Sequence, residues 1–281
     1  MKKLLISTLL LFSVLSISSQ TIKIGKTFRI EPEGFYPVLN AEGNLLAFSA
    51  KNYEGLDLYL FSDKSVQKIS DEEGAGFQPR FSEDGKLFYR NTIYISKLRY
   101  ERLKCLDLRT ATIKEEREPQ RFRSMQPLGV DLKKDFPVVW SDGKNLNIMK
   151  DGETEILNPI ENANGYIWAS LSPNRQMILF NAVAVGTFVS DLNGNIIASL
   201  GYLNAAVWYN NEFVVGMQDK DDGQHITESA IILKNLAGNV NKKLSKSGMI
   251  AMFPTASSAG KKIAYNTIEG DIFVLELDII K

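Results

Sequence analysis

A short phrase recurs along the chain and constrains its fold more than any other feature. The clearest copy is QPRFSEDGKL at 78–87, where a proline precedes a polar turn and an apolar run follows. A close relative begins at Pro37, and weaker copies begin at Ser172 and Phe253. Two degenerate copies span 127–140 and 207–215, so the phrase occurs six times. Recurrence at this spacing predicts a repeat architecture.

A second pair of apolar runs follows the copies. In the first unit, Leu56–Phe61 leads to Val66–Ile69, and in the third, Leu146–Met149 leads to Thr154–Leu157. The turns between such runs contain Gly or Asn, which supply the positive φ of short β-hairpins. Four strands in a unit of about 40 to 50 residues are typical of a β-propeller blade. The sequence therefore predicts an all-β, six-bladed β-propeller with four-stranded antiparallel blades.

The predicted blades form a single domain over 21–281. They lie at roughly 34–71, 76–116, 118–158, 165–201, 203–246 and 249–281. The last unit contains only three predicted strands, whereas 21–31 is strand-like and has no hairpin partner. We expect 21–31 to supply the outer strand of the last blade and close the ring, which removes the open edges of a linear array.

The first twenty residues have a different character. Lys2 and Lys3 precede an apolar run from Leu4 to Ile17, and small residues follow. This order predicts a secretory signal peptide over 1–20, because a spanning helix needs about 20 apolar residues. The alternative is an uncleaved membrane anchor. We expect a periplasmic or secreted protein that has no membrane span after cleavage, and no lipoprotein, because no cysteine lies near the junction.

Charge and cysteine content exclude some classes of function. The chain has 33 basic and 33 acidic residues, so nothing indicates a basic surface for nucleic acid. Cys105 is the only cysteine, which excludes an internal disulfide. Its place in the alternating run LKCLDL predicts a buried strand residue.

The best copy of the phrase resembles a known repeat. Pro-x-Phe-Ser-x-Asp-Gly-Lys-Leu at 79–87, with Asp57–Leu60 and Lys68–Ser70 as later strands, is similar to the WD40-like (PD40) repeats of the TolB propeller family. The resemblance implies a six-bladed propeller outside the cytoplasm. We expect no counterpart of the α/β domain that precedes the propeller in TolB, because the predicted blades occupy 21–281.

The sequence offers little for catalysis. His225 is the only histidine, and no G-x-S-x-G elbow is present. One cysteine and one histidine cannot make a zinc site of Cys and His ligands. We therefore predict no catalytic residue and expect no cofactor, and we leave calcium or another divalent cation open at one loop.

That loop spans 218–229 and is the most polar in the chain. In a propeller it emerges on the same face as the connections between blades, so we expect it to share a channel rim with the connection at 70–76. The candidate ligand-binding residues on this rim are Asp71, Glu72, Glu73, Asp219, Asp221, Asp222 and His225. If a metal binds, its ligands are Asp219, Asp221, Asp222 and His225. The alternative is ordinary turn chemistry, because Asp and Gly favour turns.

Two tryptophans complete the candidate site. Trp168 and Trp208 stand near predicted blade starts, where a side chain can approach the channel. Aromatic rings there can stack on a sugar or anchor a peptide, and packing between blades is the alternative.

These features predict an exported, non-catalytic propeller that acts as a binding platform in the cell envelope. Rigid scaffolds commonly carry function on their loops, and the expected partner is an envelope or secreted protein or a peptide. The alternatives are a glycan-binding module and a lyase-like, carbohydrate-active enzyme with its site in the central channel.

Overall fold

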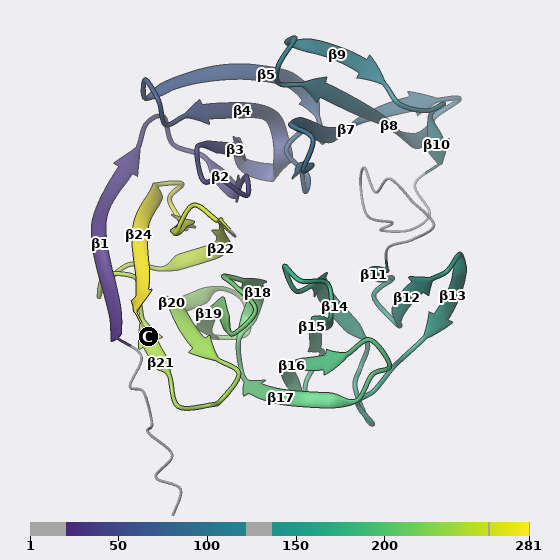
Figure 1. Ribbon diagram of the computed structural model, residues 1–281. Coiled ribbons are helices and arrows are strands. Elements are labelled where there is room, and N and C mark those ends of the chain that lie inside the picture. Colours follow the sequence, from purple (N-terminus) through teal and green to yellow (C-terminus); the bar gives the residue numbers. More distant parts are fainter. Residues whose placement is uncertain (1–20, 122–136, 258, 281) are drawn as a thin grey trace, which may run out of the picture.

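The structure is a computed structural model that describes residues 21–121, 137–257 and 259–280. Its strands form six small antiparallel sheets around a central axis, which is the arrangement of a six-bladed β-propeller (Figure 1). The predicted fold class is confirmed. The predicted signal peptide at 1–20 lies outside the described residues.

The blades follow the chain order, and the strands of each blade run from the axis outwards. Blade one consists of β2 (Phe35–Leu39), β3 (Leu45–Ser49), β4 (Glu54–Leu60) and β5 (Ser65–Glu73), with a short 3-10 helix, η1 (Lys51–Tyr53). Blade two consists of β6 (Arg80–Phe81), β7 (Lys86–Ile95), β8 (Leu98–Asp107), β9 (Thr112–Glu115) and β10 (Gln120–Arg121). Blade three contains β11 (Val138–Ser141), β12 (Leu146–Lys150) and β13 (Glu153–Ile156).

The second half of the ring is more regular. Blade four consists of β14 (Tyr166–Leu171), β15 (Met177–Ala182), β16 (Gly186–Asp191) and β17 (Ile196–Gly201). Blade five consists of β18 (Asn204–Trp208), β19 (Phe213–Asp221), β20 (Ile226–Asn235) and β21 (Asn241–Lys243). Blade six consists of β22 (Ala251–Ala256), β23 (Lys262–Thr267), β24 (Ile272–Ile280) and β1 (Thr21–Ile30).

The N-terminal strand closes the ring as predicted. β1 pairs antiparallel with β24 from Thr21 opposite Ile280 to Ile30 opposite Ile272, with one register shift between Ile24 and Thr27. Most of β1 is exposed and only Ile30 is buried. The strand therefore contributes mainly backbone hydrogen bonds, which satisfy the outer edge of β24.

Blade two extends further than predicted. β9 pairs with Lys104–Asp107 of β8, and β10 pairs with Tyr100 and Glu101 of the same strand. The predicted boundary placed 118–121 in the third blade. It was wrong because β8 has ten residues and the four-residue β9 covers only part of its outer edge. The degenerate copy predicted over 127–140 in blade three lies partly outside the described residues.

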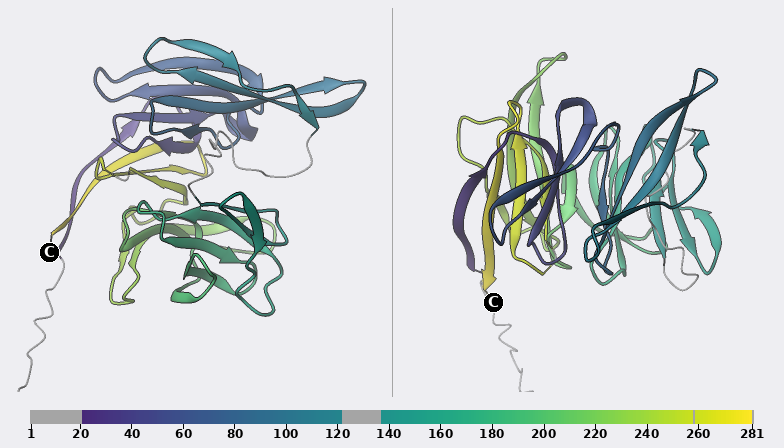
Figure 2. Two further views of the ribbon diagram at one scale, coloured as in Figure 1. Left: turned by 45° about the vertical axis from the view of Figure 1, so that its right-hand side comes forward. Right: turned by 90° about the horizontal axis from the view of Figure 1, so that it is seen from above.

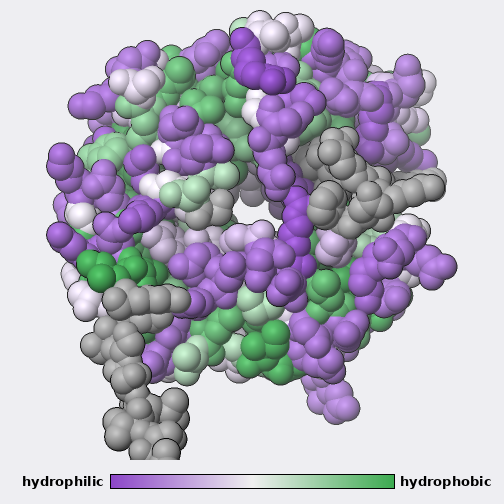
Figure 3. All heavy atoms as spheres, in the orientation of Figure 1, coloured by the Kyte–Doolittle hydropathy of each residue, from purple (hydrophilic) through white to green (hydrophobic). Residues whose placement is uncertain are grey.

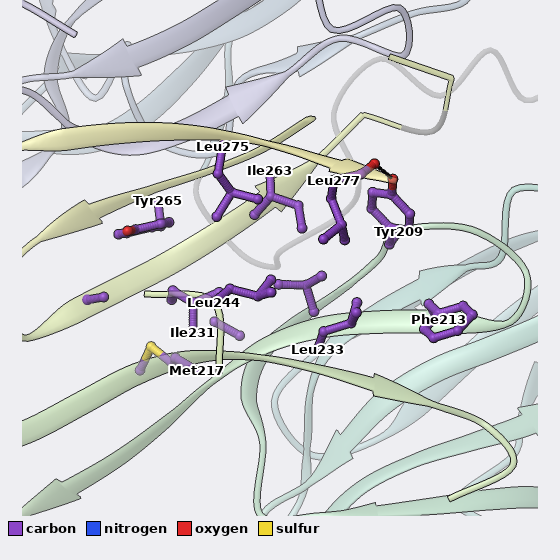
Figure 4. Close-up of a cluster of buried hydrophobic side chains, with 13 residues drawn as sticks. Tyr209, Phe213, Met217, Ile231, Leu233, Leu244, Ile263, Tyr265, Leu275 and Leu277 are labelled. Atoms are coloured by element: carbon purple, nitrogen blue, oxygen red, sulfur yellow. Dashed lines mark hydrogen bonds between the residues drawn. The ribbon is translucent and has the colours of Figure 1, made fainter. Parts of the chain in front are cut away.

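Hydrophobic clusters between neighbouring blades hold the ring together. The cluster between blades five and six contains Phe213 and Leu233 on one side and Ile263 and Leu275 on the other, all fully buried (Figure 4). Tyr209 closes it by donating a hydrogen bond to the carbonyl oxygen of Leu277. Because both sides of a blade are covered, middle strands such as β3 and β15 are nearly continuous apolar runs. Each fully buried aliphatic side chain stabilises the fold by about 1.5–3 kcal/mol.

The strand directions give the ring two distinct faces. We call one the hairpin face, because it carries the turns between the second and third strands together with the connections between blades. The described segments on it are 31–34, 50–53, 74–79, 96–97, 142–145, 157–165, 183–185, 202–203, 222–225, 244–250 and 268–271. The opposite face carries the remaining turns, and two contacts there brace the ring. Gly260 donates a backbone hydrogen bond to Ala41, and Arg175 pairs with Glu83 at 2.8 Å.

The centre of the ring is hollow on the face drawn in Figure 3, and hydrophilic residues line much of its margin. Across the described residues we find no helix with the length and hydropathy needed to cross a bilayer.

Candidate functional site

Five blades begin with the same unusual backbone conformation. In or directly before their first strands they contain a residue with φ between 45° and 53°. Tyr36, Trp168, Ala205 and Phe253 lie within the strands, and Gln78 lies two residues before β6. In four of these blades the pairing of the first two strands shifts register at this point, as it does at a β-bulge. The first strands lie nearest the axis (Figure 1). The bulges therefore determine the direction of the side chains at the point where the chain enters each blade from the hairpin face.

Four aromatic side chains from three blades meet there. Tyr36 stacks on Tyr53 with ring centroids 4.2 Å apart. Phe253 of blade six lies 4.9 Å from Tyr36, and Phe77 lies 4.9 Å from Tyr53 in an edge-to-face contact. All four side chains are half-buried. We call this group, Tyr36, Tyr53, Phe77 and Phe253, the aromatic cluster.

The aromatic cluster is closely packed and uncharged. Burial, reinforced by the neighbouring phenol of Tyr36, raises the pKa of Tyr53 to about 12. Its hydroxyl therefore keeps its proton at physiological pH. The backbone N–H of Tyr36 donates to Oδ1 of the buried Asn266 at 3.1 Å. Tyr36 and Tyr53 have φ values of 53° and 61°. Such a conformation costs a bulky residue about 1–3 kcal/mol, and it is concentrated at functional sites.

A buried ion pair supports the aromatic cluster from blade two. The Arg90 guanidinium lies 5.4 Å from the centroid of the Phe77 ring and pairs with Glu101 at 2.8 Å. Burial lowers the pKa of Arg90, and the carboxylate of Glu101 opposes this shift. The arrangement fixes the Phe77 ring and joins it to the base of the β7–β8 hairpin.

The predicted acidic residues of blade one lie beside this group at the end of β5. Glu72 accepts hydrogen bonds from Lys104 Nζ at 2.6 and 2.8 Å, so its charge is neutralised within the protein. Glu73 accepts one from the Tyr94 hydroxyl at 3.3 Å, and Asp71 is exposed.

The predicted acidic residues of blade five lie elsewhere on the same face. Asp219 and Asp221 belong to β19, and Asp222 and His225 belong to the following turn. Blades one and five are not neighbours in the ring, so the two acidic groups do not form one cluster. Among the described residues, no three His, Cys, Asp or Glu side chains come together as a group suited to a metal ion.

The polar segment at 218–229 is a hairpin rather than a long loop. β19 continues to Asp221 and β20 begins at Ile226, so only four residues turn. Asp222 Oδ1 accepts backbone N–H bonds from Gln224 at 2.9 Å and His225 at 2.8 Å. The bond from His225 contributes most to lowering the pKa of Asp222. These contacts are turn chemistry.

Asp219 has a separate environment. It is 9% exposed and accepts hydrogen bonds from the Tyr202 hydroxyl at 3.2 Å and from Asn204 Nδ2 at 3.1 Å. Burial and the nearby Asp219 carboxylate raise the pKa of Tyr202. Tyr202 is half-exposed in the connection between blades four and five.

The two candidate tryptophans have different environments. Trp208 is buried between blades four and five, and its indole N–H lies 3.4 Å from the Ser170 carbonyl oxygen. Trp168 is 37% exposed on the first strand of blade four. Trp208 is therefore a packing residue, and Trp168 is available to a ligand.

Sequence reasoning missed the aromatic cluster, although a signal existed. Aligning the repeated phrase on Pro37 and Pro254 brings the residues before them, Tyr36 and Phe253, to equivalent positions. Tyr53 and Phe77 carry no such mark, because one lies in η1 and the other in a blade connection.

Comparison with known proteins supports the fold. No family model and no curated protein sequence matches the chain. The β-propeller domain of Cps50 (Swd1) from Myceliophteria thermophila superposes with a TM-score of 0.55 at 10% identity, covering 91% of this chain and 99% of that one. Regucalcin from Agrobacterium tumefaciens, a calcium-binding protein, gives 0.52 at 11% identity, covering 89% and 94%. Oligogalacturonate lyase from Vibrio parahaemolyticus gives 0.50 at 12% identity, covering 88% and 79%.

These neighbours include a binding protein and an enzyme. Identities this low show the shared β-propeller fold and leave function to be argued from the site.

Proposed function

We propose that this protein is an exported, non-catalytic β-propeller whose hairpin face binds an envelope or secreted protein or a peptide. The observation that carries the proposal is the aromatic cluster. Half-buried tyrosines and phenylalanines on a rigid frame supply apolar contact area at low entropic cost, and such residues are enriched where proteins bind partners.

The only histidine supports a role without catalysis. His225 is exposed in the turn of the blade-five hairpin, where its backbone is engaged by Asp222. General base catalysis needs a reacting group within hydrogen-bond reach and a third group that orients the imidazole. An exposed turn position favours neither requirement.

Site-specific photocrosslinking tests the proposal. A photoreactive phenylalanine analogue is placed at Tyr53 or Phe253 on the hairpin face, and at Lys64 on the opposite face as the control. In cells that make the protein, we expect protein adducts at the first two positions and not at Lys64. Adducts at Lys64 alone, or equal adducts at all three positions, would contradict it. Cleavage of 1–20 and recovery in the envelope or medium test the export.

Glycan binding is a second candidate, favoured by the exposure of Trp168. An indole on the inner strand can stack on a sugar ring. Quenching or a shift of Trp168 fluorescence by soluble oligosaccharides, abolished in Trp168→Ala and retained in Tyr53→Ala, would favour a glycan over a protein.

A further inference from the structure

Two hairpins rise further from the hairpin face than the others, and they stand on opposite blades. β7 and β8 have ten residues each, and β19 and β20 have nine and ten. The matching strands of blades one and four have five to seven. Figure 2 (right) shows both long hairpins extending from the same side of the ring. Blades two and five are three positions apart in a ring of six, so the hairpins flank the channel.

The blade-two hairpin ends in exposed apolar side chains. Tyr94, Ile95 and Leu98 are 62%, 45% and 42% exposed. Ile95 pairs directly with Leu98 across the strands, so both side chains lie on one side of the hairpin and Tyr94 lies on the other. We call the segment Tyr94–Arg99 the blade-two tip.

The blade-two tip is pre-organised. Ser96 and Lys97 both have positive φ, which closes the hairpin with a tight two-residue turn. Arg99 donates a hydrogen bond to Thr92 Oγ1 at 3.1 Å. Further down, the Arg90–Glu101 ion pair fixes the base of the hairpin. An apolar anchor held in one conformation loses little entropy on binding.

The two long hairpins have opposite charge. Lys97 and Arg99 lie between 93 and 100, where there is no acidic residue. The segment 218–228 contains four acidic residues, Asp219, Asp221, Asp222 and Glu228, and one lysine, Lys220. Glu73 of β5 contacts the tip through the Tyr94 hydroxyl at 3.3 Å, and Lys97 and Arg99 together outweigh this one carboxylate. A ligand above the channel therefore meets net positive charge on one side and negative charge on the other.

We propose that the blade-two tip docks an apolar, acidic segment of the partner protein. The inference rests on the proposed function, because it assigns a chemistry to the partner of the hairpin face. The apolar side chains of the segment cover Ile95 and Leu98 on one side of the hairpin, and its carboxylates face Lys97 in the turn. Such complementarity raises the association rate and selects the partner.

The opposite hairpin favours a protein over an anionic membrane. A bilayer rich in acidic lipid attracts a basic, apolar tip. The same flat surface would also approach the acidic blade-five hairpin, which extends from the same side, and would repel it. The surface charge of a protein varies from place to place, so a partner protein can match both hairpins.

The test uses two labelled peptides and one kind of vesicle. The first peptide alternates aspartate with leucine and phenylalanine, and the second has lysine in place of each aspartate. The vesicles contain phosphatidylglycerol and phosphatidylethanolamine. Fluorescence anisotropy gives the affinity for the protein without its first twenty residues, and hydrogen exchange locates the contact. We expect the acidic peptide to bind and to protect the backbone amides of 92–100.

Variants of exposed residues separate the contributions. We expect Ile95→Ser combined with Leu98→Ser to weaken the acidic peptide roughly tenfold, because two apolar anchors lose their contact. Lys97→Glu should weaken it roughly fivefold at low salt and much less at about 0.5 M salt. The matched control is Ile196→Ser with Ile197→Ser, which alters two exposed isoleucines on blade four, and we expect no change.

Three results would overturn the inference. In the first, the lysine peptide binds at 92–100 as tightly as the acidic peptide. In the second, the blade-four control loses as much affinity as Ile95→Ser with Leu98→Ser. In the third, vesicles protect 92–100 and the acidic peptide does not bind. The variant Tyr53→Ala distinguishes this inference from the proposed function. Suppose that the acidic peptide still binds at 92–100 in Tyr53→Ala, and that crosslinking at Tyr53 and Phe253 yields no adduct. The aromatic cluster is then not the binding site, whereas the blade-two tip still is.

Discussion

Replacing Glu101 by glutamine removes the charge partner of a buried guanidinium at the base of the blade-two hairpin. Arg90 and Glu101 lie 2.8 Å apart, with side chains 6% and 17% exposed. Removing one partner of a fully buried pair costs about 3–5 kcal/mol, because the other charge stays buried without compensation. Glu101 keeps some contact with water and glutamine can still accept a hydrogen bond. We therefore expect Glu101→Gln to lower the free energy of unfolding by about 3 kcal/mol.

Urea denaturation followed by circular dichroism measures this loss. With a urea m-value of about 3 kcal/mol per molar for a domain of this size, the midpoint should fall by roughly 1 M. The matched control is Glu115→Gln. Its partner Arg102 lies 3.0 Å away, but the side chains of Arg102 and Glu115 are 30% and 53% exposed. An ion pair this open to solvent contributes at most about 1 kcal/mol, so the control should shift the midpoint little.

A double variant tests whether charge burial is the cause. Arg90→Met with Glu101→Leu removes both charges and also Arg90 Nε, which has no hydrogen-bond partner among the described residues. Replacing a buried pair with apolar residues of similar volume is often neutral or stabilising. We expect the double variant to recover most of the stability lost in Glu101→Gln. The reasoning is refuted if Glu101→Gln costs no more than Glu115→Gln, or if the double variant is less stable than the single one.

Three further predictions concern the ring and its buried groups. Ile30→Ala should lower the free energy of unfolding by about 2–5 kcal/mol, because Ile30 is 1% exposed. Ile24→Ala in the same strand should cost under about 0.5 kcal/mol, because Ile24 is 37% exposed. Equal losses in the two variants would contradict ring closure through Ile30. Burial raises the pKa of the Cys105 thiol to about 11, so Ellman's reagent at pH 8 should react with it far more slowly in native protein than in urea. Burial raises the pKa of Tyr53 and Tyr265 from 10.0 to about 12, so between these pH values the folded state retains protons that the unfolded state loses. The free energy of unfolding should therefore be unchanged below pH 10 and decrease from pH 10 to 12. A flat profile in alkaline denaturation would exclude this linkage.

The sequence predicted the ring because a propeller repeats its local rules. A polar turn such as Ser82–Gly85 between two apolar runs is a local signal, and so is each short hairpin turn. Ring closure was also predictable, because 21–31 and the three strands of the last unit each lacked a partner. The boundary of blade two was not predictable, because β10 is defined by the length of β8 and not by its own two residues.

The candidate site was harder to predict for a geometric reason. Acidic residues at 71–73 and 219–222 share a face, and topology alone shows that. The predicted blade ranges already place the two groups at blades one and five, so their separation could have been predicted. The partners of the carboxylates, such as Lys104 for Glu72, could not, because they come from other strands. The blade-two tip is apolar in sequence like any strand. Only the projection of β7 and β8 beyond the ring leaves Tyr94 and Leu98 exposed.

The repeated bulge links the fold to the site. Positive φ is tolerated best by glycine and asparagine, so a bulge with a purely structural role would favour them. The described blades have neither residue there, and three of the five positions hold aromatic residues, Tyr36, Trp168 and Phe253. Tyr36 and Phe253 offset their backbone strain by packing together in the aromatic cluster. Trp168 is 37% exposed, so much of its ring is left for contacts that a bound partner would supply. The same bulge conformation thus holds two packed aromatic residues on one side of the ring and an exposed tryptophan on the other.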